Sequence, residues 1–202
     1  MFRLLPLLLL TACVTTTQVT GIATADASIP VVLFNSPVNR DSVREAAAEL
    51  LQQKSSNHYM YINSPGGDLD AAKSLTKIFS LLHKKGDKLV CFAGPMVASA
   101  AYFLYLHCDT RYALPDSVLF PHRIHIWFPE PMLPEILVQV GVLTIREQMQ
   151  WDKEGMEITG MSEEDYTQFR DSDDAYWTIP EILAKSKKKW FTVLPYYNFL
   201  VK

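Results

Sequence analysis

The sequence predicts an α/β protein in which a mostly parallel β-sheet is flanked by helices. Short apolar, β-branched runs alternate with segments of helical periodicity through the first half of the chain. Hydrophobic residues make up 49% and charged residues 20% of the 202 residues, which suits one domain with a substantial core. Alternation of strand and helix implies right-handed βαβ crossovers, and neither an internal repeat nor a second domain boundary is visible.

The individual elements follow from apolar runs for strands and from capping residues with 3.6-residue periodicity for helices. The expected strands cover residues 29–34, 58–63, 88–92, 110–113 and 118–120. The expected helices cover residues 39–53 (starting at Asn39 or Asp41), 68–82, 97–107 and 134–154, with one more after Ser162. We expect Gly94-Pro95 to end the third strand, because proline lacks the N–H that a sheet requires.

The N-terminus has the pattern of a secretory signal. Arg3 precedes the apolar run 4–10, which is too short to span a bilayer. The following Leu-Thr-Ala-Cys at 10–13 resembles a bacterial lipobox, which implies removal of residues 1–12 and lipidation of Cys13; an ordinary cleavable signal is the alternative. Residues 13–28 predict a flexible tether ahead of a folded domain at 29–202. Val14 resembles the sorting residue of lipoproteins anchored to the outer membrane, facing the periplasm.

Composition disfavours several classes of protein and of site. The chain has 19 basic and 22 acidic residues, a net charge of −3, whereas nucleic-acid-binding proteins usually carry a basic surplus. The five histidines lack metal-ligand spacing, so we expect no metal and no cofactor. Three cysteines are too few for a disulfide scaffold, and Cys91 and Cys108 either form a bridge or stay buried thiols.

Two loops at the carboxyl ends of predicted strands are candidates for chemistry, because functional loops of such sheets gather there. In the loop 63–68, Gly66 and Gly67 permit a positive φ and present backbone N–H groups to an anion or oxyanion. In the segment 94–101, Ser99 is surrounded by small residues at a strand-to-helix turn, where the helix dipole favours developing negative charge. Taken singly, each loop is more simply explained as an ordinary turn.

Together, three motifs resemble a known family. The run Tyr-Ile-Asn-Ser-Pro-Gly-Gly at 61–67 is similar to the glycine-rich segment of the Clp protease proteolytic subunit (ClpP), and 96–104 resembles its nucleophile segment. The run 112–117 followed by Pro121-His122 is similar to its histidine segment. The resemblance covers residues 30–125 and continues weakly to 181. It implies the ClpP/crotonase-like fold of stacked βαβ units.

The resemblance also implies roles for individual residues. Ser99 would be the nucleophile and His122 the general base of a Ser-His-Asp triad. The N–H groups of Gly67 and Ala100 would form the oxyanion hole, while Gly66 shapes the turn and contacts substrate. Asp171 matches the third member best, and Asp173 and Asp174 are the alternatives.

We therefore expect a periplasmic, membrane-anchored serine endopeptidase that forms a homo-oligomer through its last helices. Its substrates would be peptides or unfolded proteins, and no ATP-driven unfoldase would assist it, because the periplasm has essentially no ATP. A catalytically inactive scaffold is the alternative, since the bulky, proline-containing segment 123–131 departs from the family's substrate-binding strand. Acyl-CoA chemistry is disfavoured because the periplasm lacks CoA. Lys73 is interpreted as solvated rather than as the base of a Ser-Lys dyad, and His125 as pointing away from His122.

Overall fold

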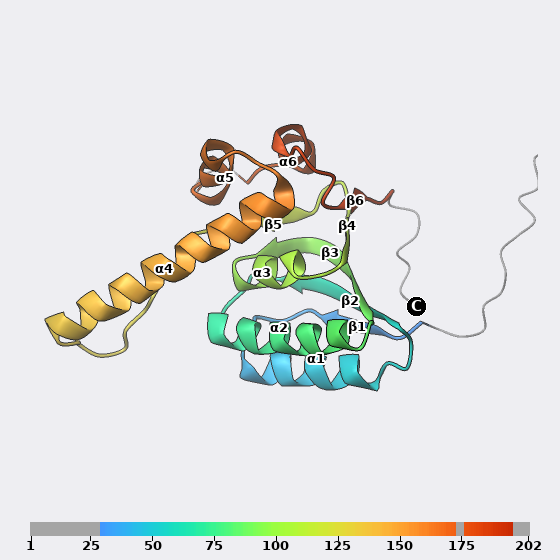
Figure 1. The fold of residues 1–202 in the computed structure, drawn as a ribbon, viewed down its shortest axis with the longest axis horizontal. Helices are drawn as coiled ribbons and strands as arrows, with labels where there is room; N and C mark the ends of the chain where they lie inside the picture. The colour runs from blue at the N-terminus through green and yellow to red at the C-terminus, as the bar shows by residue number, and fades with distance from the viewer. Residues whose placement is uncertain (1–28, 173–175, 196–202) are drawn as a thin grey trace, which may run out of the picture.

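The computed structural model describes residues 29–172 and 176–195, whose central feature is a six-stranded sheet (Figure 1). The strands are β1 (Val31–Phe34), β2 (Asn57–Ser64), β3 (Lys88–Ala98), β4 (Thr110–Ala113), β5 (Val118–Phe120) and β6 (Thr192–Val193). Their order is β1-β2-β3-β4-β6, with β5 paired to β3, and every pairing is parallel. The predicted signal (1–12) and tether (13–28) lie outside the described residues.

The helices cover one face of the sheet and extend beyond one end of it. They are α1 (Arg40–Gln52), α2 (Leu69–Lys84), α3 (Ala100–Leu106), α4 (Pro134–Thr159), α5 (Glu163–Arg170) and α6 (Ile179–Lys185). Figure 1 shows α1, α2 and α3 on the same side of the sheet and α4 projecting away from the body. The predicted class, a mostly parallel sheet flanked by helices, is confirmed. Within the described part of the chain, no helix has the length and apolar character needed to cross a membrane.

Local capping fixes where the first two helices begin, as the sequence predicted. The Asn39 side chain accepts hydrogen bonds from the N–H groups of Asp41 and Ser42, and the Ser42 hydroxyl accepts one from the Asn39 N–H. Asp68 accepts a hydrogen bond from the Ala71 N–H at the start of α2. Each cap therefore satisfies backbone N–H groups in the first turn of its helix.

The core lies between the sheet and α1, α2 and α3. Met60 and Ile62 of β2 are fully buried and belong to the same apolar cluster as Leu50 of α1 and Leu75 and Phe79 of α2. Burial alternates along β2, so every second residue points to the opposite face and is only half-buried or exposed. The two faces of the sheet therefore have different environments.

Strand β3 is longer than the sequence predicted. It continues through Pro95 to Ala98, because its second half, Met96–Ala98, pairs with β5 rather than with β4. Pro95 is exposed, where its missing N–H leaves no ladder bond unmade. The predicted helix 97–107 consequently begins only at Ala100, which places Ser99 at the junction of strand and helix.

Three further differences concern the second half of the chain. Helix α4 continues beyond residue 154 to Thr159, where Gly160 ends it in the left-handed conformation. Helix α6 and strand β6 were not predicted. Strand β6 is two residues long and depends on its pairing with β4, which is distant in the sequence.

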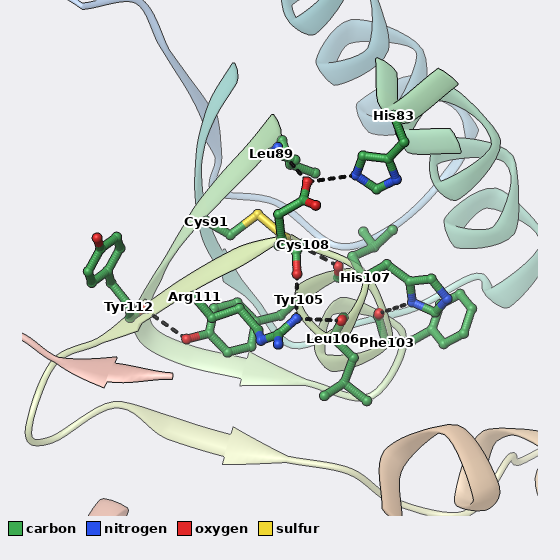
Figure 2. The surroundings of a disulfide bond; sticks show 12 residues. His83, Leu89, Cys91, Phe103, Tyr105, Leu106, His107, Cys108, Arg111 and Tyr112 are labelled. Atoms are coloured by element: carbon green, nitrogen blue, oxygen red, sulfur yellow. Dashed lines mark hydrogen bonds and ion pairs between the residues drawn. A yellow bond between two sulfur atoms is a disulfide. The ribbon is translucent and has the colours of Figure 1, made fainter. Parts of the chain in front are cut away.

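The structure joins Cys91 and Cys108 in a disulfide, which decides between the two states that the sequence left open. Their Cα atoms are 6.0 Å apart, and the bond ties β3 to the segment after α3 (Figure 2). Arg111 lies beside the bridge and donates hydrogen bonds to the carbonyl oxygens of Leu106, Cys108 and Trp190. The bridge and this arginine together fix the end of α3 relative to β4.

Candidate functional site

Ser99 occupies a strained turn between β3 and α3. Its φ is 54°, and it is the one non-glycine residue with a positive φ in the described ranges. Such a conformation costs about 1–3 kcal/mol and persists only where the surrounding structure imposes it. Here the Ser99 N–H donates to the Phe120 carbonyl oxygen at 2.8 Å, so β5 holds the turn in place while the side chain stays partly exposed.

Gly66 packs directly against this turn. A Cβ at Gly66 would lie 2.5 Å from the Ser99 Cβ and 2.6 Å from the Ala98 carbonyl oxygen, and the φ of Gly66 is +93°. The Val38 N–H donates to the Gly66 carbonyl oxygen at 2.8 Å, which fixes the loop from its other side. Only glycine satisfies both the conformation and the available space.

Two backbone donors flank Ser99 without a partner in the described part of the chain. The Gly67 N–H makes no hydrogen bond there, although the neighbouring Asp68 N–H donates to the Val38 carbonyl oxygen. Ala100 is the first residue of α3, so its N–H has no acceptor within the helix. A Cβ at Gly67 would collide with the Val38 carbonyl oxygen. The two residues predicted to form the oxyanion hole therefore have N–H groups available for an acceptor.

A groove of about 770 Å³ joins these groups to His122. Its walls are the loop after β2, the Ser99 turn, the segment 122–127 and the inner face of α4. A second, smaller cavity of about 20 Å³ also opens beside Ser99 and His122. It is lined mainly by aromatic and apolar side chains, among them Tyr102, Phe103 and Trp151. The structure thus brings Gly66, Gly67, Ser99, Ala100 and His122 to one site.

His122 faces this groove with a defined tautomer. Its Nδ1–H donates to the Arg123 carbonyl oxygen at 2.6 Å, which leaves the lone pair of a neutral ring on Nε2. No hydrogen bond joins His122 to Ser99 or to Asp171 among the described residues. His125 was expected to point away from His122, as alternate residues of a strand do. Residues 121–128 form no strand, and the ring centroids of His122 and His125 lie 5.1 Å apart.

Asp171, at the C-terminal end of α5, is held by two arginines. Arg123 donates to both carboxylate oxygens at 3.0 and 2.5 Å, and Arg170 does so at 2.7 and 3.0 Å. Hydrogen bonds first from Arg123 and then from Arg170 hold the pKa of the Asp171 carboxyl well below its usual range. The alternatives Asp173 and Asp174 lie outside the described residues.

A polar network that the sequence analysis missed connects the histidine segment to α4 and α5. The Ile124 N–H donates to Gln148 Oε1 at 2.7 Å, and Gln148 Nε2 donates to Asp152 Oδ1 at 2.9 Å. Asp152 in turn pairs with the mostly buried Arg170. The signal in the sequence was the polar pair Gln148 and Asp152, whose spacing of four residues places both on one face of the helix.

Lys73 is less solvated than expected. Its ammonium pairs with Glu147 of α4 and lies 3.6 Å from a carboxylate oxygen of Asp70. The pair with Glu147 ties α2 to α4 at the edge of the groove. No cluster of ligating side chains that could hold a metal ion occurs in the ranges that the structure describes.

Comparison with known families agrees with this geometry. The family model of the Clp protease family matches residues 16–176, most of the chain. This chain belongs to the Clp protease family. The match begins inside the segment predicted as a tether and includes Ser99, His122 and Asp171. None of the curated proteins matches the chain. Membership makes the fold ClpP-like and, at a coarse level, the protein a ClpP-like peptidase or scaffold.

A Gly66→Ala substitution tests the contact between the glycine loop and the Ser99 turn. We expect Gly86→Ala, at a similar φ of +86° but in open space, to lower the free energy of unfolding by about 1–2 kcal/mol. Gly66→Ala adds overpacking and should cost at least about 2 kcal/mol more. Urea unfolding of both variants measures the difference, and equal losses would show that the contact is unimportant.

An Asp171→Asn substitution tests the carboxylate between the two arginines. Because the pKa of Asp171 is depressed in the folded protein, its ionised form stabilises the fold above the carboxyl pKa of the unfolded chain, about 4, and this stabilisation is lost as pH falls. We expect the variant to be less stable than wild type at pH 7, with the gap narrowing below about pH 5. Unfolding in urea between pH 3 and 7 measures this, with Asp70→Asn, at a 92% exposed side chain, as the control. A gap independent of pH would contradict the role of the charge.

Proposed function

We propose that this protein is a lipid-anchored, periplasmic serine endopeptidase that hydrolyses peptide bonds without an ATP-driven partner. The observation that supports it most is the Ser99 turn. A strained serine, His122, and N–H donors from Gly67 and Ala100 that have no acceptor among the described residues line one groove. This is the set of groups that acyl transfer through a serine nucleophile needs.

The proposed chemistry proceeds through an acyl-enzyme. Nε2 of His122 accepts the hydroxyl proton as Ser99 Oγ bonds to the substrate carbonyl carbon, and the N–H groups of Gly67 and Ala100 stabilise the oxyanion. When the tetrahedral intermediate collapses, the C–N bond breaks and His122 donates the proton to the leaving amine. Water then attacks the ester carbonyl carbon while His122 takes one of its protons. The bond between the acyl carbon and Ser99 Oγ breaks, the carboxylic acid leaves, and His122 returns the proton to Ser99 Oγ.

Asp171 is proposed as the third member of the catalytic triad. Its present hydrogen bonds show which contacts would have to change before it could bond to His122. His122 Nδ1–H donates a hydrogen bond to the Arg123 carbonyl oxygen. The guanidinium groups of Arg123 and Arg170 donate hydrogen bonds to the Asp171 carboxylate. A triad with Asp171 bonded to His122 therefore requires the segment around Arg123 to shift. Because this segment also forms one wall of the groove, an extended peptide bound there would contact it.

The proposed location in the cell envelope rests on the N-terminus and agrees with the disulfide. The proposal that Cys13 is lipidated, and that the domain faces the periplasm from the outer membrane, rests on the lipobox-like residues 10–13. The bridge between Cys91 and Cys108 suits an oxidising compartment. Without an unfoldase, the substrates would be short peptides or unfolded proteins that enter the groove unaided.

We also propose that the protein self-associates through α4. Val138, Val142, Ile145 and Met149 are all exposed and follow one another at spacings of four, three and four residues. This heptad spacing forms a seam that another helix can pack against. A helix with so much exposed apolar surface is expected to be covered by a partner, and a second copy of α4 offers a complementary seam.

A catalytically inactive scaffold is the second candidate. The observation that favours it is the pairing of Asp171 with two arginines, which leaves His122 oriented by a backbone carbonyl. In that case the groove would bind a peptide segment of an envelope protein without cleaving it.

Labelling with a fluorophosphonate probe tests the proposed nucleophile. We expect the purified protein to be labelled, Ser99→Ala to lose all labelling, and His122→Ala to slow it by about 10²–10⁴-fold. Ser74→Ala, which changes a hydroxyl on the exposed side of α2, is the control and should label normally. Labelling that persists in Ser99→Ala would refute the assignment, and a folded wild-type protein that never labels would favour the scaffold.

Substitution on the outer face of α4 tests self-association. We expect Ile145→Glu to shift the wild-type oligomer to smaller species in sedimentation velocity, because a charge would be buried in the seam. Gln139→Glu places the same charge on an exposed part of the same helix that lies off the seam and should leave the oligomer intact. A wild-type monomer, or equal behaviour of the two variants, would contradict the proposal.

A further inference from the structure

The small cavity beside Ser99 continues from the groove. Ser99, His122 and Trp151 line both spaces, so they lie where the cavity meets the groove. The cavity lies between α3 and α4, and the buried side chains of Tyr102 and Phe103 form part of its wall. Its volume is about 20 Å³, whereas that of the groove is about 770 Å³. The groove therefore has room for a stretch of peptide, and the cavity has room only for part of one side chain.

Two stacked aromatic rings limit the size of this cavity. Trp151 of α4 lies on Phe103 of α3, with ring centroids 4.2 Å apart and an angle of 10° between the planes. The Phe103 ring also lies 4.2 Å from the His107 ring. His107 is itself held, because its Nδ1–H donates to the Phe103 carbonyl oxygen at 2.8 Å (Figure 2) and its Nε2 lies 3.7 Å from a carboxylate oxygen of Glu154. Phe103 cannot turn away from the cavity without losing both ring contacts.

Contacts between α4 and α5 hold the far side of the cavity. The mostly buried Arg170 of α5 pairs with Asp152 of α4, and Gln148 Nε2 donates to Asp152 at 2.9 Å. Close by, a Cβ at Gly155 would collide with the Tyr166 hydroxyl, so the two helices pack as closely as a glycine allows. Close-packed interiors of this kind yield little to an added group. The size of the cavity is therefore set by packing on both sides.

The volume decides which side chains the cavity accepts. A cavity needs about 10–15 Å³ to hold one water-sized group, so about 20 Å³ admits a methyl or hydroxymethyl group but not a branched or aromatic side chain. A larger side chain would have to displace Trp151 or Phe103, and such overpacking is unfavourable. In an acyl-enzyme the acyl residue is bonded to Ser99, so its side chain is the part of a substrate nearest to the cavity.

We propose that Trp151, stacked on Phe103, restricts the peptidase to substrates with a small residue, alanine or serine, on the acyl side of the scissile bond. This inference rests on the proposed function and names its substrate class. Trp151 is then a specificity-determining residue that acts by excluding volume. A smaller residue at this position should admit larger substrate side chains and should not abolish cleavage.

Fluorogenic peptides that differ only in the residue before an aminocoumarin leaving group test the proposal. For the wild type, we expect kcat/KM of the alanine peptide to exceed that of the leucine and phenylalanine peptides at least about tenfold. Trp151→Ala should raise kcat/KM of the leucine peptide at least about tenfold, because the removed indole leaves space for the larger side chain. Gln150→Ala shortens the exposed neighbour on the same helix and should keep the wild-type ranking.

Trp151→Leu is a second variant, since it keeps an apolar side chain at this position and disturbs the packing less than Trp151→Ala. We expect it to improve cleavage after valine and leucine but not after phenylalanine. Circular dichroism establishes that each variant is folded. Labelling with the fluorophosphonate probe establishes that Ser99 remains reactive, so a change in ranking reports on the cavity and not on the nucleophile.

The outcomes separate this inference from the proposed function. Labelling of Ser99 together with equal kcat/KM for the alanine and leucine peptides would overturn the size limit and leave the proposed peptidase standing. A folded wild type that neither labels nor cleaves would refute the peptidase, and the cavity is then tested by calorimetry with peptides that end in alanine or leucine. Tighter binding of the alanine peptide to the wild type, reversed in Trp151→Ala, would support the size limit. Equal binding, or binding of neither peptide, would overturn it.

Discussion

The close approach of the glycine loop to the Ser99 turn determines the geometry of the whole site. Because Gly66 has no side chain, the loop after β2 lies against the end of β3, and the N–H groups of Gly67 and Ala100 come to flank one serine. Two backbone hydrogen bonds maintain this contact. The Phe120 carbonyl oxygen of β5 accepts a hydrogen bond from the Ser99 N–H, and the Gly66 carbonyl oxygen accepts one from the Val38 N–H. The strain at Ser99 is thus sustained by hydrogen bonds from elements on either side.

The two halves of the site differ in how they are held. Gly67, Ser99 and Ala100 lie at the ends of strands, which rigid parallel pairing fixes. The histidine and the aspartate instead belong to segments joined by a polar network that includes Arg123, Gln148 and Arg170. Ion pairs and hydrogen bonds of this kind can exchange partners, whereas a sheet register cannot shift by a fraction of a residue. In this member of the Clp protease family, the half of the site that holds His122 and Asp171 is therefore the more adaptable half.

One apolar surface remains uncovered in the described part of the single chain: the outer face of α4, with Val138, Val142, Ile145 and Met149. It lies on the opposite side of α4 from the groove, so it is not needed to build the site. Apolar surfaces of this extent normally mark contacts with other protein segments. The proposed pairing with a second copy of α4 would cover this surface.

Local sequence determined much of the fold and part of the site. Apolar runs gave the strands, Asn39 and Asp68 gave the helix starts, and the glycine pair and Ser99 marked two loops, because periodicity, capping and turn preferences act within a few residues. His122 was found through the resemblance of its segment to ClpP. Tertiary structure decided the rest. Strand β3 passes Pro95 because β5 pairs beyond it, and the disulfide depends on a 6.0 Å separation. Asp171 meets Arg123 across 48 positions of sequence. Such contacts depend on where distant segments meet in space, and short stretches of sequence do not determine this.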